Sequence, residues 1–115
     1  MKSFVYAWRG ILHVFRTQRN FRIHLAVAVL VLLAGVGVGM TSLELALLAL
    51  TIALVLVAEV INTGVEAAVD LVTLDHEPRA EIAKDVAAGA VLLSAVFSVV
   101  VGILVFVPHL VRLFY

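Results

Sequence analysis

Apolar residues recur at helical spacing through most of the chain, and short polar breaks divide it into four segments. In residues 2–16, the apolar positions share one face while basic residues seven positions apart share another. This pattern predicts an amphipathic helix that lies in a membrane interface with its basic side towards the headgroups. Three longer apolar stretches follow, at about residues 23–40, 43–72 and 80–106, and each can form a membrane-spanning helix.

The second apolar stretch has a clear start and is longer than one crossing requires. Thr41 and Glu44 have the spacing of a capping box at its beginning. Because residues 43–72 exceed the length of a single span, the far end is expected to project into water. Glu66 and Asp70 lie in that projecting end.

Glycines lie near the end of the first span, and a proline follows the third span. The segment with Gly35, Gly37 and Gly39 has no lysine of the kind found in a phosphate-binding loop. These glycines are therefore predicted to let neighbouring helices approach closely. The third span is expected to end near residue 106, ahead of Pro108 and a short aromatic tail.

Composition supports the membrane interpretation. Of the 115 residues, 64% are hydrophobic, against roughly 45–50% in an ordinary globular domain, and the mean hydropathy is +1.21. Lipid must therefore be part of the solvent of this chain. Eight basic residues balance eight acidic ones, which gives no reason to expect a nucleic-acid partner. The absence of cysteine excludes disulfides and thiolate metal sites, and arginines interrupt the apolar run that a cleavable signal peptide needs.

The basic residues also predict an orientation. Five precede the first span, none lies between the first and second spans, two lie around the second connection, and one follows the third span. The positive-inside rule therefore places the N-terminus and the connection at residues 73–83 in the cytoplasm, and the C-terminus outside.

Four polar residues of the second span conflict with its apolar character. Glu59, Asn62, Glu66 and Asp70 fall within an arc of roughly 80° on one helix face. Ionisable groups at membrane depth are costly, and they usually line a functional site enclosed by protein. A polar seam between packed helices would account for a single amide, but three acids and an amide favour a site. Because one three-helix protomer cannot shield this stripe from lipid, an oligomer is expected.

The chemistry of this stripe suits phosphoryl transfer at the membrane surface. Carboxylates beside Lys84 could bind a divalent cation with a polyphosphate, since Mg²⁺ takes one or two carboxylates plus substrate phosphates. A carboxylate held deeper, in low dielectric, could act as general base for an alcohol that arrives from the bilayer. On spacing alone, Lys84 and Asp85 fit a solvated helix start equally well. A proton or cation pathway is the alternative function, because a file of acids along one helix also suits ion relay.

The run from Glu59 to Asp70, followed by Lys84-Asp85-Val-Ala-Ala-Gly, resembles the prokaryotic diacylglycerol kinase family. The resemblance covers essentially the whole chain, as one domain over residues 1–115. The block Arg19–His24 is more similar to the undecaprenol kinase branch than to the diacylglycerol-specific branch.

This resemblance implies an all-α membrane protein with a surface helix and three transmembrane helices, assembled as a homotrimer with shared sites. It also implies an ATP-dependent lipid kinase of the bacterial inner (plasma) membrane that uses Mg²⁺. The expected acceptor is undecaprenol first and diacylglycerol second.

Carried over position by position, the resemblance assigns roles to individual residues. Glu59 matches the catalytic base and Glu66 the magnesium-binding carboxylate, while Gln18 stands where the family commonly has a second metal-binding glutamate. The family's nucleotide-contacting positions correspond to Tyr6, Gln18, Glu66, Asp75, His76, Glu77, Lys84 and Asp85. Asn62 and Asp70 match polar residues that support the site. The lone histidines His13, His24 and His109 are expected to be interface residues without a role in the site.

Overall fold

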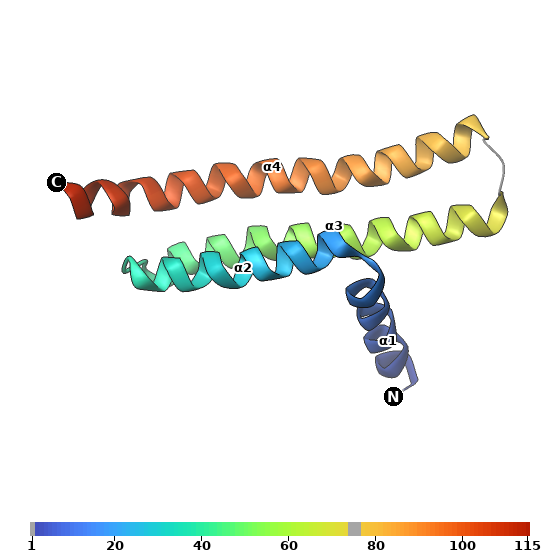
Figure 1. Ribbon diagram of the computed structural model, residues 1–115, viewed down its shortest axis with the longest axis horizontal. Helices are drawn as coiled ribbons and strands as arrows, with labels where there is room; N and C mark the ends of the chain where they lie inside the picture. Colours follow the sequence, from blue (N-terminus) through green and yellow to red (C-terminus); the bar gives the residue numbers. More distant parts are fainter. Residues whose placement is uncertain (1, 74–76) are drawn as a thin grey trace.

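The computed structural model describes residues 2–73 and 77–115, which form four helices (Figure 1). They are α1 (Lys2–Thr17), α2 (Arg19–Gly37), α3 (Ser42–Val72) and α4 (Pro78–Phe114). No strand occurs in this part of the chain. Because α2, α3 and α4 are each long and apolar enough to cross a membrane, the expected all-α membrane architecture is confirmed.

Helix α3 is the centre of the arrangement. Both α2 and α4 pack against it, and each runs antiparallel to it. In Figure 1 the three long helices lie alongside one another, whereas α1 projects away from them near the start of α2. The protomer has only a small buried core, around Met40, Leu48 and Val105, at the end of the bundle near the α2–α3 turn. Most of its apolar surface is therefore available to lipid or to other protomers.

The turn between α2 and α3 explains two of the three glycines. The N–H groups of Gly39 and Met40 donate to the carbonyls of Val36 (3.1 Å) and Gly35 (3.0 Å). This is a Schellman ending, in which Gly39 takes the left-handed conformation with φ +84°. A Cβ on Gly35 would come within 2.8 Å of the Met40 sulfur, which folds back over it.

The expectation that these glycines let helices approach one another holds for Gly35 alone, because a Cβ there would also lie 3.1 Å from the Leu45 side chain of α3. Gly35 and Gly39 serve the turn, and nothing lies within 4 Å of a Cβ added at Gly37. The next residues behave as predicted: the side chains of Thr41 and Glu44 cap each other's backbone N–H groups at 3.2 and 3.0 Å, which confirms the capping box.

A single extended residue, Gln18, separates α1 from α2 (φ −106°, ψ 106°). The Arg22 guanidinium reaches back and donates to the carbonyls of Phe15 (2.7 Å) and Arg16 (3.1 Å). These carbonyls belong to the last turn of α1, where helical partners are missing and a cation is favoured. Arg22 thus fixes the angle between α1 and α2 and the place of Gln18 between them.

Helix α4 extends further than expected, because it continues through Pro108 to Phe114. A proline removes one backbone hydrogen bond, but contacts with α3 support the helix on both sides of it. Val105 is buried against α3, and Nε2 of His109 lies 3.0 Å from a carboxylate oxygen of Glu44. His109 was expected to be an interface residue without a role in the site, and its contact with Glu44 lies at the α2–α3 turn end of the bundle.

Candidate functional site

The predicted polar stripe lies along the second half of α3, and its deepest member is enclosed. Glu59 is only 6% exposed, and it is the one charged residue that the described part of the chain buries. Asn62 and Glu66 follow on the same helix face and are half-buried. Residues three and four apart on a helix are neighbours, so these side chains form a continuous row.

A polar cavity of about 330 Å³ lies beside this row, where the break between α1 and α2 meets α3 and α4. Gln18 and the first turns of α2 form one side, α3 contributes the polar floor, and small or apolar residues of α4 close the third side. The residues that line it are Gln18, Asn20, Phe21, His24, Glu59, Asn62, Thr63, Ala88, Val91, Leu92 and Ala95. The structure therefore brings together the predicted residues Gln18, Glu59 and Asn62.

His24 contacts the buried carboxylate directly, although the sequence predicts only an interface residue at this position. Its Nδ1 lies 2.6 Å from Oε1 of Glu59, so the two side chains join α2 to α3. The other carboxylate oxygen, Oε2, is buried and has no hydrogen-bond partner within the described residues, and the same holds for Oδ1 of Asn62. The Thr63 hydroxyl cannot serve them, because it donates to the backbone carbonyl of Glu59 at 2.9 Å.

Buried polar atoms are normally paired. Two unpaired oxygen acceptors on residues that line one cavity therefore indicate a site for a ligand that brings its own donors.

A second polar cluster lies further along α3, towards its cytoplasmic end in the predicted orientation. Nζ of Lys84 lies 2.6 Å from Oδ1 of Asp70, and the charge of Glu66 also acts on Lys84. Asp70 follows Glu59 by eleven residues, roughly 16 Å along the helix axis. None of these three residues lines the polar cavity, so the described protomer holds the two clusters apart.

The other predicted contacts lie outside both clusters. Glu77 caps α4 by accepting from the backbone N–H of Arg79 at 3.3 Å. Tyr6 is exposed on α1, with the Arg9 guanidinium 5.9 Å from its ring centre, and Asp85 is exposed on α4. Asp75 and His76 lie outside the described residues.

The oxygen atoms of the described site could bind a hard cation such as Mg²⁺ only if a substrate supplied further oxygen ligands. Across the described chain, no group of three or more His, Cys, Asp or Glu side chains is placed to hold a metal ion. The cavity offers amide oxygens instead, including the unpaired Oδ1 of Asn62. Oxygen donors with few carboxylates fit magnesium that keeps substrate phosphates among its ligands.

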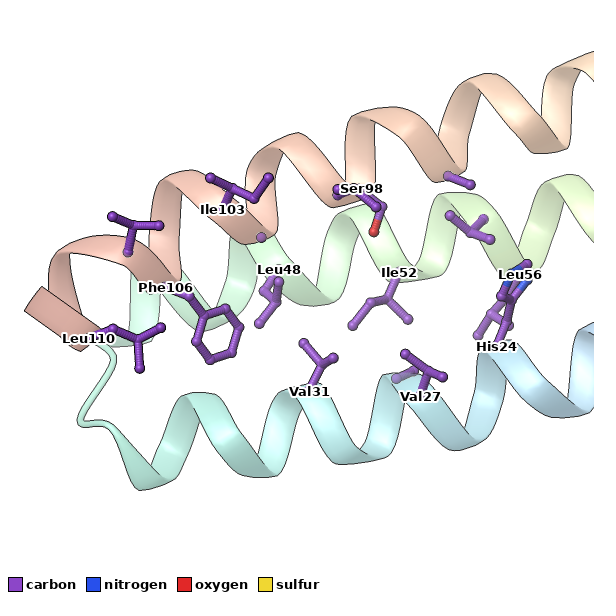
Figure 2. Close-up of a pocket in the computed structure, with 16 residues that line it drawn as sticks. His24, Val27, Val31, Leu48, Ile52, Leu56, Ser98, Ile103, Phe106 and Leu110 are labelled. Carbon is purple, nitrogen blue, oxygen red and sulfur yellow. The ribbon is translucent and has the colours of Figure 1, made fainter.

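An apolar groove of about 470 Å³ runs between α2 and α4 over the face of α3 (Figure 2). Figure 2 shows His24 at one end and Leu110 at the other, with Val31, Leu48 and Phe106 between them. His24 and Ala95 line both the groove and the polar cavity. The two spaces therefore meet at His24, beside the buried carboxylate.

Sequence reasoning missed His24, although a signal for it exists. Phe21, Ala28 and Gly35 are the buried residues of α2 and are seven positions apart. His24 follows Phe21 by three positions, so it belongs to the same helix face. A polar residue on the inner face of a span usually faces a partner within the protein.

Comparison with known proteins shows the family to which the chain belongs. Residues 5–106 match the family model described as prokaryotic diacylglycerol kinase. The chain is 46% identical over 109 residues to an undecaprenol kinase of Bacillus subtilis, a match that covers 95% of this chain and 89% of that protein. It is also 46% identical over 112 residues to a diacylglycerol kinase of Synechocystis, covering 96% of this chain and 64% of that longer relative. The chain belongs to the prokaryotic diacylglycerol kinase family.

Proposed function

We propose that this protein is a membrane lipid kinase that transfers the γ-phosphoryl group of ATP to the hydroxyl of a lipid alcohol. The observation that carries the proposal is the junction at His24, where an apolar groove meets a polar cavity that holds a buried carboxylate. A lipid alcohol has the same two parts, an apolar chain and a hydroxyl head. The groove would take the chain and the cavity would take the hydroxyl.

The favoured acceptor is undecaprenol, with diacylglycerol second. Identity alone does not separate them, because both curated relatives are 46% identical to this chain. The extent of the match favours undecaprenol, since this chain covers 89% of the undecaprenol kinase but 64% of the diacylglycerol kinase. The Arg19–His24 block supports the same choice.

In the proposed reaction, Glu59 is the general base. Its unpaired Oε2 accepts the proton of the lipid hydroxyl while the alcohol oxygen forms a bond to the γ-phosphorus and the bond to the β-phosphate oxygen breaks. Glu59 itself is only 6% exposed, which limits the access of bulk water that would otherwise compete as acceptor of the phosphoryl group. The products are the lipid phosphate and ADP.

The phosphates would be bound nearer the surface. Lys84 is proposed to leave Asp70 and stabilise the phosphoryl group, since catalysis of this reaction is chiefly positioning and electrostatics. Tyr6, Asp75, His76, Glu77 and Asp85 are proposed nucleotide contacts, and Asn62 and Asp70 support the site.

Magnesium would be held by Glu66 and Gln18 together with the phosphates of the nucleotide. It would neutralise part of the phosphate charge. Gln18 offers a neutral oxygen, so Glu66 would be the single carboxylate that the chain supplies.

The active site is proposed to face the cytoplasm of a bacterial inner membrane, in a homotrimer. The distribution of basic residues supports this orientation. The separation of Glu59 from Lys84 within one protomer supports an assembly in which neighbours complete each site.

A proton or cation pathway along the acidic stripe is less well supported. Two of the three acids have partners: Glu59 lies against His24, and Asp70 against Lys84. An ion pathway would leave the basic face of α1 and the apolar groove without a function.

The test is transfer of label from γ-labelled ATP to undecaprenol and to diacylglycerol, presented in parallel to the purified protein in lipid nanodiscs. We expect label in both lipids, with the higher kcat/KM for undecaprenol. Glu59→Gln should lower turnover by about 100-fold or more while assembly is unchanged. Glu44→Gln is the matched control, because it alters the other His–Glu pair at the far end of the bundle.

Near-normal turnover by an assembled Glu59→Gln protein would show that the base lies elsewhere. Absence of label in both lipids, with proton or cation flux through reconstituted vesicles, would favour the ion pathway instead.

A further inference from the structure

His24 is the one cavity residue whose side chain hydrogen-bonds to the Glu59 carboxylate within the described structure. Nδ1 and Oε1 are 2.6 Å apart, a short contact that joins two helices. In the ionised form that a general base requires, the carboxylate can only accept, so Nδ1 would carry the hydrogen. Glu59 is 6% exposed, whereas the His24 side chain is 36% exposed and faces both the cavity and the groove.

The second His–Glu pair shows what a purely structural pair looks like in the same molecule. Nε2 of His109 lies 3.1 and 3.0 Å from the two carboxylate oxygens of Glu44, and one of them also accepts from the backbone N–H of Thr41. Both oxygens of that carboxylate are therefore occupied. The Glu59 carboxylate differs, because His24 occupies Oε1 and leaves Oε2 buried and unpaired.

We infer that His24 is a positioning residue, which holds Oε1 of Glu59 so that Oε2 faces the lipid hydroxyl at the mouth of the apolar groove. The inference rests on the proposed function, in which Glu59 is the base. A glutamate side chain has three rotatable bonds, and a free one would spread its oxygens over several positions. One donor from α2 removes that freedom, and it also stabilises the ionised carboxylate that the base requires.

The first test compares three variants by kcat and KM. His24→Leu removes the donor and should lower kcat by about 10- to 100-fold, because misplacement of a reacting group by about 1 Å has a cost of that order. The KM for ATP should not change. His24→Asn places an amide N–H near the position of Nδ1 and should recover most of the activity. His109→Leu removes a histidine from the other pair and should lower thermal stability while kcat is retained.

The second test asks whether His24 acts through Glu59. In a Glu59→Gln background, His24→Leu should cause little further loss, because residues that act as a unit are not additive. Independent, multiplying losses would overturn the inference, and so would an equal fall in kcat for His109→Leu.

The outcomes separate this inference from the proposed function. If Glu59→Gln is inactive and an assembled His24→Leu protein keeps wild-type kcat, only the positioning role fails. If Glu59→Gln retains turnover, the assignment of the base fails whatever His24 does. Should His24→Leu not assemble, His24→Gln takes its place: its longer amide reaches the Nε2 position, so it should be less active than His24→Asn, and the reverse order would overturn the inference.

Discussion

Gln18 is the residue at which the break between two helices becomes part of the candidate site. It has extended backbone angles, its amide lines the polar cavity, and Arg22 fixes the helix junction around it. A neutral amide binds a hard cation less strongly than a carboxylate, since affinity depends on the charge of the ligands. The protein should therefore need more free Mg²⁺ than a variant with an acid at this position.

Gln18→Glu should lower the Mg²⁺ concentration for half-maximal activity by roughly several-fold, with the lipid preference unchanged. The reduction is limited because ATP brings most of the negative charge to the cation. Kinase activity titrated against Mg²⁺ measures it. Asn20→Asp is the control, because it adds the same charge to the same cavity from a neighbouring position. An equal shift in both variants would mean that Gln18 is not a direct ligand.

At this scale, sequence reasoning succeeded within a helix and failed between helices. The spacing of Glu59, Asn62 and Glu66 is enough to place them on one face of α3. No spacing within one helix states which residue of another helix meets that face. The pairing of Glu59 with His24 depends on how α2 and α3 are rotated against each other, and only the structure supplies that setting.

The elements themselves define where a lipid chain can lie. The groove follows α4 from Ala95 to Leu110, about 22 Å along the helix axis. Gly102 is part of its lining, and nothing lies within 4 Å of a Cβ added there. A larger side chain at this position would therefore enter the groove without a clash in the protein.

Gly102→Leu should raise the KM for the lipid alcohol by about tenfold and leave the KM for ATP unchanged, since a few methylene groups in an apolar pocket have an effect of this size. Initial rates measured against each substrate in turn decide it. Gly37→Leu is the control: it makes the same change at an open helical glycine that does not line the groove. If both variants keep the wild-type KM for lipid, the lipid chain does not lie in the groove.

Element boundaries were predictable where a local signal sets them. The capping box at Thr41 gave the start of α3 to within one residue. The end of α4 was not predictable from Pro108, because tertiary contacts outweigh the hydrogen bond that proline removes. Gly39 was misread because a helix ending and a helix contact both select small residues.

At the scale of the whole molecule, the candidate site of one protomer consists of two separate polar clusters. Lys84 is held by Asp70, and neither residue lines the cavity around Glu59. Much apolar surface on all three long helices is exposed. Both features are expected of a subunit whose neighbours complete its site in a cyclic assembly.

A mixture of two inactive variants tests this arrangement. Glu59→Gln and Lys84→Ala subunits, co-expressed in equal amounts, should recover activity, because about one site in four would combine an intact Glu59 with an intact Lys84 from a neighbour. Phosphorylation of lipid alcohol by the purified mixed oligomer is the measurement. Each variant expressed alone is the control. No recovery in oligomers shown to contain both subunits would mean that each site is built within one protomer.

The length of helix α2 is fixed at both ends. Its 19 residues extend about 28 Å, close to the roughly 30 Å of a bilayer's hydrocarbon core. Arg22 secures one end and the Gly39 turn the other, so a hydrophobic mismatch can be relieved only by tilting the helix or deforming the bilayer. His24 lies in the second turn of α2, so such a tilt would change the depth of its contact with Glu59. Membrane thickness, and with it the acyl composition of the surrounding lipids, would thereby act on the geometry of the base itself.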